Sequence, residues 1–240
     1  NYLEYFLNEG KNHVINNARA LYFGGQFLGI PNISSLARKL LITEANKLIS
    51  DNGFLVEGSS HYQLLISRTL LEINWVALST NDKKFVKKIK PLSKKMHHSC
   101  TFFNTHGIDS FPKIGDVSPD CSIAWLYSLV DSENKERSWS DLWSENKLYF
   151  PDNTPNNKDI SLSNIDNWVK INNNSWKLFT FLHGGKNEYP LNHGHSDFGS
   201  FILLHDAQII LNDPGRFNYD IDNLDRNGYD AKSHNTVLID

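Results

Sequence analysis

Two histidines stand two residues apart in a segment that reads PLNHGHSDFGS. In an extended strand this spacing places the side chains of His193 and His195 on the same face. Gly194 between them leaves the backbone open to close approach by a ligand. With Asp213 and His234, which follow at later strand ends, these residues offer the ligand chemistry of a Zn²⁺ site. For any one histidine alone, a hydrogen-bonded surface or core residue is the alternative interpretation.

Three polar stretches interrupt the apolar patterns of the first half. Asn12-His13 opens an apolar helix, where the amide can neutralise a substrate carboxylate and the imidazole can act as a base or bind substrate. The alternative is that Asn12 caps the helix and His13 lies on the surface. The stretch EGSSHY presents Tyr62 between two helices, where its phenol either reaches a cleft or packs with a satisfied hydroxyl. Asp116, in FPKIGD, is also explained by turn chemistry.

Size and composition bound the class of protein. The 240 residues suffice for one large domain or two modest ones, and hydrophobic and aromatic contents of 40% and 12% are those of a globular protein. The formal charge of -3 argues against binding to nucleic acid, and no apolar run is long enough to insert into a membrane. Two cysteines are too few for a disulfide framework. Because the sequence starts at Asn1 and ends in an apolar segment, we expect a piece of a longer protein.

A lysine-rich stretch stands out in this acidic chain. Such a basic run can steer a polyanion, although a solvated helix face is the commoner explanation. Its members are Lys83, Lys84, Lys87, Lys88, Lys90, Lys94 and Lys95.

The first half has a helical pattern. Apolar residues at near-helical spacing predict a series of helices joined by short polar loops, as in an array of helical hairpins. The second helix is expected to be capped by Ser34-Ser35, and the fourth to be disturbed at Pro91. The predicted helices cover residues 14–28, 34–50, 62–78, about 82 onward, and 121–130.

The pattern changes from about residue 131. Residues 132–174 are rich in Asn, Asp, Ser and Lys and are predicted to contain little regular structure. After Trp176 the apolar runs are short and strand-like, at 177–182, 201–204, 208–211 and 236–239, and a turn at residues 205–207 predicts a hairpin of the second and third runs. A helical part followed by strands predicts an α+β fold. We therefore expect three regions: helices in 1–130, an irregular connection in 131–175, and antiparallel strands in 176–240.

Taken together, the polar stretches resemble the heparinase II/III-like family of polysaccharide lyases. The matching stretches come in the family's order and span nearly the whole chain. They are Asn12-His13, DNGFLVEGSSHYQ (51–63), FPKIGD (111–116), NHGHSDFGSF (192–201), LNDPG (211–215) and SHNTVLID (233–240).

The resemblance implies an incomplete (α/α) toroid followed by an antiparallel β-sheet sandwich, of which this chain would hold the last toroid helices and the first strands. It also places an active cleft between the two parts. The residues expected to converge there, as catalytic groups, are Asn12, His13, Tyr62 and His193.

The implied activity is β-elimination of a uronic-acid-containing, hence anionic, polysaccharide. Asn12 would neutralise the uronate carboxylate, Tyr62 would act as acid and base, and His13 or His193 would serve as base on the opposite face of the sugar. The family's metal positions fall on His195, Asp213 and His234, where a Zn²⁺ ion would brace the sheet. Substrate-binding roles are predicted for Glu57, His61 and Asn192. The resemblance further implies a periplasmic or secreted protein.

Two other functions stay open at the level of sequence. A metal-dependent hydrolase would use His193, His195, Asp213 and His234 to activate water, although no glutamate base stands beside the histidines. A non-catalytic carbohydrate-binding protein would use the aromatic side chains and the lysine run. Neither the polysaccharide nor the oligomeric state is predicted.

Overall fold

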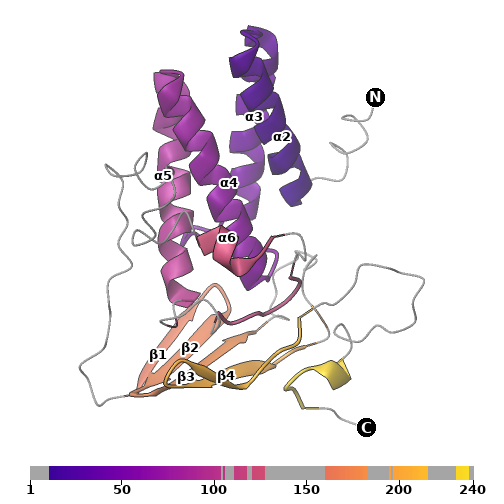
Figure 1. The fold of residues 1–240 in the computed structure, drawn as a ribbon, viewed down its shortest axis with the longest axis vertical. Helices are drawn as coiled ribbons and strands as arrows, with labels where there is room; N and C mark the ends of the chain where they lie inside the picture. Colours follow the sequence, from indigo (N-terminus) through magenta and orange to yellow (C-terminus); the bar gives the residue numbers. More distant parts are fainter. Residues whose placement is uncertain are drawn as a thin grey trace. The chain divides into compact units, whose positions relative to one another are not determined.

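The computed structural model describes residues 11–103, 105, 111–117, 121–127, 160–182, 195, 197–215 and 231–237. In this part of the chain the helices come first and the strands after them, which confirms the predicted α+β class (Figure 1). The helices are α2 (Lys11–Phe27), α3 (Pro31–Leu48), α4 (Ser60–Ser79), α5 (Lys83–Ser99), η1 (Cys100–Phe103), α6 (Ile123–Tyr127) and η4 (Ala231–Ser233). The strands are β1 (Ser161–Ile165), β2 (Trp168–Asn173), β3 (Trp176–Phe181), β4 (Phe201–His205) and β5 (Gln208–Leu211).

The chain divides into two units. The first consists of Asn1–Leu55 and Leu65–Ser99, and the second of Val56–Leu64 and Cys100–Asp240. This division differs from the predicted boundaries at 130 and 175. The polar stretch before α4 and the segment after α5 belong to the same unit as the strands. Contacts between segments that are distant in sequence determine this grouping, so the sequence pattern does not show it.

The first unit contains a tightly packed pair of helices. A Cβ atom at Gly25 of α2 would lie 2.7 Å from Ser34 Oγ and 2.9 Å from Ser34 N, so glycine permits α3 to approach this closely. The predicted cap at Ser34-Ser35 is wrong, because α3 already begins at Pro31. Proline suits this first position, since the N–H that it lacks would have no partner within the helix. Helix α5 continues to Ser99 with Pro91 inside it, so the predicted disturbance does not end the helix.

The second unit contains a five-stranded antiparallel sheet in the order β1-β2-β3-β4-β5. The interpretation of residues 132–174 as irregular is wrong from Ser161 onward, because β1 and β2 lie there. Strand β1 is a largely exposed edge, so its composition is polar like that of a loop. Asp166 and Asn167 join the two strands with φ of 53° and 69°, the left-handed pair typical of a two-residue hairpin turn.

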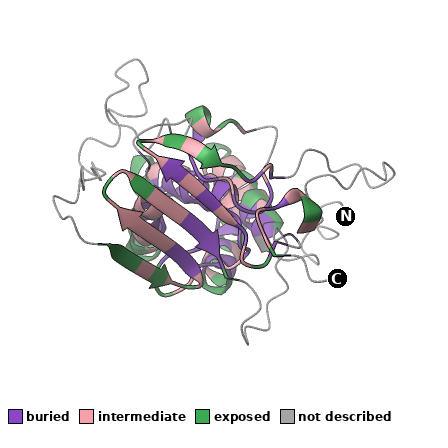
Figure 2. Ribbon diagram, turned by 90° about the horizontal axis from the view of Figure 1, so that it is seen from below, coloured by how far each residue is buried: buried purple, intermediate pink, exposed green. Residues whose placement is uncertain are grey.

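One face of the sheet forms the core of the second unit. The Trp168 ring lies 4.9 Å from the ring of Phe103 in η1, and Phe179 lies 6.1 Å from Phe102. Lys170 of β2 donates to the carbonyl oxygen of Phe102 at 2.8 Å. In Figure 2 the buried residues of the sheet concentrate on its central strands, whereas β1 and β5 are mostly exposed.

The hairpin predicted after the histidine cluster is confirmed. Strands β4 and β5 are joined by Asp206-Ala207, with φ of 47° and 66°. The strand predicted at 236–239 does not include Thr236 or Val237, and the rest of that range lies outside the described residues. Among the residues described, no helix has the length and apolar character needed to cross a bilayer.

Candidate functional site

The amino-terminal end of α4 holds the segment that carries Asp116. Ser59 caps the helix by accepting the Tyr62 N–H at 3.0 Å, and its hydroxyl donates to the Asp116 carbonyl oxygen at 2.7 Å. The Ser60 N–H donates to the Ile114 carbonyl at 3.0 Å, and the Ile114 N–H donates to Ser60 Oγ at 3.0 Å. These reciprocal bonds fix residues 114–116 relative to the first turn of the helix.

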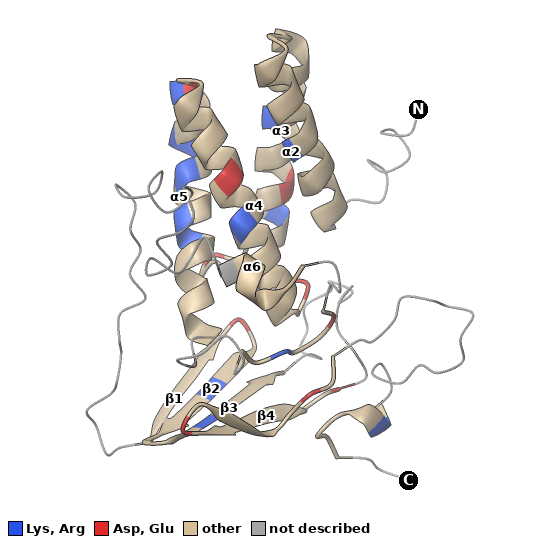
Figure 3. Ribbon diagram, viewed as in Figure 1, with Lys and Arg blue, Asp and Glu red and all other residues tan. Residues whose placement is uncertain are grey.

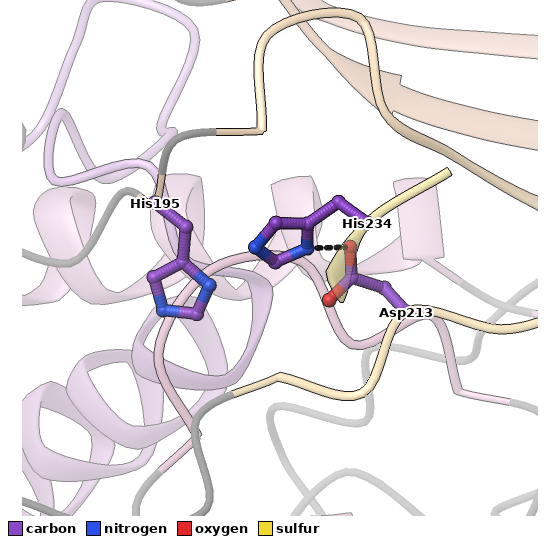
Figure 4. A group of neighbouring side chains, drawn as sticks. All are labelled: His195, Asp213 and His234. Carbon is purple, nitrogen blue, oxygen red and sulfur yellow. Dashed lines mark hydrogen bonds and ion pairs between the residues drawn. The ribbon is translucent and has the colours of Figure 1, made fainter. Parts of the chain in front are cut away.

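Two buried histidine–carboxylate pairs meet at this segment. His195 Nε2 lies 2.8 Å from Asp116 Oδ1, and His234 Nδ1 lies 2.7 Å from Asp213 Oδ2. The centres of the two imidazole rings are 5.2 Å apart. Figure 4 shows the ring of His234 between His195 and Asp213. Side chains of both pairs are at most 1% exposed, so each carboxylate gives its histidine the bonding partner that burial demands.

Asp213 is oriented by further hydrogen bonds. Ser200 Oγ donates to Asp213 Oδ2 at 3.1 Å, and the Gly215 N–H donates to Oδ1 at 2.9 Å. Gly215 has a φ of 66°, and a Cβ atom there would lie 3.0 Å from a methyl carbon of Val117. A larger residue would therefore disturb the turn that delivers this N–H to the carboxylate.

The turn that carries His234 is tied to the sheet. The Asn235 side-chain amide donates to the carbonyl oxygens of Phe201 and Asn212, both at 3.0 Å. Asn235 thereby links the end of η4 to the start of β4 and the end of β5. The imidazole of His234 consequently has a fixed position relative to the hairpin that delivers Asp213.

The site has donor atoms that could hold a metal ion. His195, Asp213 and His234 each offer one ligand atom, and these atoms lie within 4.8 Å of one another. Zinc–ligand distances of about 2.0–2.2 Å place neighbouring ligands about 3.5 Å apart, so binding would draw the side chains inward by about an ångström. A carboxylate on the other ring nitrogen, as Asp116 stands on His195, is usual for metal-binding histidines. These residues therefore fit a structural ion.

Tyr62, His61 and Glu57 lie in the second unit, near the start of α4. Tyr62 is partly exposed on the first turn of the helix. His61 is buried and its Nε2–H donates to the Cys121 carbonyl at 2.7 Å, while burial lowers the pKa of the imidazole. Glu57 is buried as well. Of these three residues, Tyr62 is the one that is partly exposed.

The other predicted catalytic residues lie in the first unit or outside the described residues. Asn12 and His13 lie on the first turn of α2 in the first unit, where Asn12 is buried and His13 is exposed. Asn192 and His193 lie outside the described residues. The structure thus brings together the three predicted metal ligands, and it leaves the convergence of the four catalytic residues as a prediction.

Sequence reasoning missed several residues of the site. The sequence singles out the stretch FPKIGD, but it assigns Asp116 no role beyond turn chemistry and no histidine partner. Ser59 carried a usable signal, because a serine directly before an apolar helical run is a common cap. Ser200 carried none, since nothing local indicates that its hydroxyl bonds to Asp213.

The fold of the chain is similar to that of known structures. No protein-family model and no curated protein matches the sequence. A crystal structure of heparinase III matches 95% of the chain with a TM-score of 0.68 at 18% identity, and a second heparinase III structure matches 94% with a TM-score of 0.67 at 16% identity. A mutant of heparan sulfate lyase HepC from Pedobacter heparinus matches 90% with a TM-score of 0.55 at 18% identity.

The chain spans 38%, 36% and 34% of the lengths of these three proteins. The similarity extends over both the helices and the sheet, as the high coverage of this chain requires. At sequence identities of 16% to 18%, this similarity shows a shared fold and nothing more specific. The chain therefore has a heparinase-like fold, with helices followed by an antiparallel sheet.

Proposed function

We propose that the protein cleaves a uronic-acid-containing polysaccharide by β-elimination. The observation that carries this proposal is the similarity in fold, over 95% of the chain, to a heparinase III structure. The similar structures include a heparan sulfate lyase, so an anionic polysaccharide is the substrate that the proposal names. We further propose that the protein meets this substrate in the periplasm or outside the cell.

In this proposal the chemistry starts at the sugar carbon next to the carboxylate. The C5 proton of a uronate is weakly acidic, and neutralising the carboxylate stabilises the enolate-like intermediate by several kcal/mol. Asn12 provides this neutralisation. Tyr62 gives a proton to the departing glycosidic oxygen and, for the suitable epimer, also removes the C5 proton. For the other epimer, His13 or His193 removes the proton from the opposite face.

Tyr62 is suited to this role by its position. Its backbone N–H is bound by the capping Ser59, which also bonds the carbonyl of Asp116. The residue is nevertheless partly exposed, as a group that meets a substrate must be. A fixed backbone with an accessible phenol favours proton transfer in a defined geometry.

The buried histidine–carboxylate site supports the catalytic residues indirectly. The bond from His195 to Asp116 holds this end of the histidine cluster against the segment that the first turn of α4 binds. A zinc ion held by His195, Asp213 and His234 would supply structural bracing. Glu57, His61 and Asn192 are proposed to contribute to substrate binding.

A hydrolytic use of this site is disfavoured by burial. The side chains of His195 and His234 are 0% exposed and that of Asp213 is 1% exposed. A metal that activates water needs an open coordination position that substrate can reach. The closed environment therefore favours a structural role.

The assay for the proposal follows absorbance during incubation with uronate polysaccharides. Elimination creates an unsaturated uronate that absorbs ultraviolet light, whereas hydrolysis creates new reducing ends without that absorbance. Tyr62→Phe should reduce the rate at least about 100-fold with little change in substrate affinity, because the phenol acts on a proton in transit. Circular dichroism controls for folding. Full activity in Tyr62→Phe would refute the assignment of Tyr62, and reducing ends without absorbance would refute elimination.

A further inference from the structure

A basic pocket lies between α3 and α5 of the first unit, apart from every residue assigned above. Its volume is about 410 Å³, a size usual for small-ligand sites. Buried Phe85 contributes to its lining. Its polar lining consists of Ser35, Arg38, Lys39, Thr43, Lys84 and Lys88. The Lys and Arg residues along α5 and α3 are blue in Figure 3.

Three lysines give this pocket its charge. Lys84 and Lys88 are one helical turn apart on α5, and Lys39 faces the same pocket from α3. All three are exposed, and none forms an ion pair with any residue that the structure describes. Like charges at this helical spacing destabilise a helix slightly, so helix stability does not explain the arrangement.

Arg38 of the pocket lining is paired with an acidic group. Asp82 accepts hydrogen bonds from Arg38 Nε at 2.6 Å and from the Tyr22 hydroxyl at 3.0 Å. This contact also fixes the Arg38 guanidinium at the pocket wall. The three lysines therefore leave a net positive field, and the exposed hydroxyls of Ser35 and Thr43 add hydrogen-bond donors.

We propose that this pocket is an accessory binding site for the sulfate groups of a sulfated polysaccharide. A sulfate group presents several acceptor oxygens, which three ammonium groups and two hydroxyls can satisfy together. The site lies outside the proposed catalytic residues, and it lets the protein hold a second stretch of a long substrate. That the ligand is a polysaccharide follows from the proposed function, on which this part of the inference rests. That the pocket binds a tetrahedral oxyanion follows from the lining residues alone.

The test measures binding of sucrose octasulfate by calorimetry. This probe carries sulfates but no uronate, so a lyase cannot cleave it. Titrations are made at about 0.15 M salt, where the Debye length is about 8 Å and long-range attraction is screened. The pocket variant is Lys84→Gln/Lys88→Gln. The matched control is Lys83→Gln/Lys87→Gln, which removes two exposed lysines from the same helix at the same spacing but outside the pocket lining.

We expect the pocket variant to weaken binding about tenfold and the control less than about twofold, since direct charged contacts exceed long-range attraction. Equal losses in the two variants, or unchanged binding in the pocket variant, would overturn the proposal. Inorganic phosphate and inorganic sulfate are then compared as competitors. Displacement of the probe by phosphate at far lower concentration would contradict a sulfated ligand.

A kinetic arm separates this inference from the proposed function. With a long sulfated polysaccharide as substrate, the pocket variant should raise KM several-fold and leave kcat unchanged, because the lost contacts do not touch the reacting sugar. An equal KM in the pocket variant would contradict the accessory role. If the protein makes no unsaturated product at all, the proposed function fails, while the calorimetric comparison still decides whether the pocket binds sulfate.

Discussion

The arrangement of Asp116, His195, Asp213 and His234 follows from the physics of buried polar groups. An imidazole removed from water needs a partner for its N–H, and each of these two rings has a carboxylate within 2.8 Å. Asp116 and His195 are 79 positions apart in the sequence, so no local pattern joins them. The residue types at the site were therefore predictable from the sequence, whereas the pairing of Asp116 with His195 was not.

Removal of the Asp116 carboxylate should be costly. Asp116→Ala leaves the buried His195 ring without this acceptor, and we expect a loss of about 3 kcal/mol in the free energy of unfolding. Urea denaturation measures the loss. Asp51→Ala, at an exposed aspartate, serves as the control and should change stability by less than about 0.5 kcal/mol. Equal stabilities of the Asp116→Ala variant and the unmutated protein would contradict the role assigned to the pair.

Chelation tests the proposed zinc ion without any assay of activity. We expect about one zinc per chain, and a chelator should lower the melting temperature by several degrees, because an ion that binds the folded state alone stabilises it. His234→Gln should contain no zinc, and its melting temperature should not respond to the chelator. Elemental analysis and thermal unfolding provide the two readouts. A zinc-free protein that gains no stability on addition of the metal would show that the site is held by hydrogen bonds alone.

At the scale of elements, the first turn of α4 organises the second unit. Its two serines bind the backbone of residues 114–116, and Tyr62 projects from the same turn. Apolar periodicity predicts the helix over 62–78, and it is observed as Ser60–Ser79, because the capping Ser59 starts the helix two residues before the periodic pattern does. Strand β1 escaped prediction for the opposite reason, since an exposed edge strand needs few apolar residues.

Ser59 should contribute more than an ordinary helix cap. Ser59→Ala removes both the bond from the Tyr62 N–H and the bond to the Asp116 carbonyl, and we expect a loss of about 2 kcal/mol in the free energy of unfolding. Ser79→Ala, at the exposed end of the same helix, should change stability by less than about 0.5 kcal/mol. Denaturant titration of both variants measures the difference. A similar small effect in both would mean that Ser59 is not a cap of this kind.

At the scale of the whole molecule, the order of helices and strands could be predicted but the grouping of segments could not. Helical periodicity and the β4–β5 hairpin are local patterns, and both were recognised. The inclusion of Val56–Leu64 with the strands depends on contacts between distant segments. The placement of Asn12 relative to Tyr62 likewise remains a prediction, because they belong to different units.

The stability of the protein should fall in mild acid because of His97. Burial, followed by the nearby charge of His98, lowers the pKa of His97 from 6.5 to about 4. The folded state thus favours the neutral ring, whereas the unfolded chain takes up a proton below pH 6.5. The stability that the neutral ring contributes is therefore complete above pH 6.5 and is lost as the pH falls toward about 4. The loss amounts to at most about 3 kcal/mol in the free energy of unfolding.

Denaturant unfolding at a series of pH values measures this loss. His97→Gln should flatten the dependence between pH 6.5 and about 4. The control His98→Gln, at an exposed neighbour, should preserve most of it. The interpretation would be wrong if the two variants kept the same slope as the unmutated protein.

The central claim is that the protein breaks glycosidic bonds by elimination, and isotope incorporation tests it most directly. Digestion of a uronate polysaccharide in water enriched in oxygen-18, followed by mass spectrometry of the products, distinguishes the two ways of breaking the bond. Elimination adds no water, so the account predicts unsaturated products that carry no oxygen-18 from cleavage. Saturated products in which each cleaved bond has placed one oxygen-18 on the new reducing end, and none on the new non-reducing end, would show hydrolysis and contradict the account.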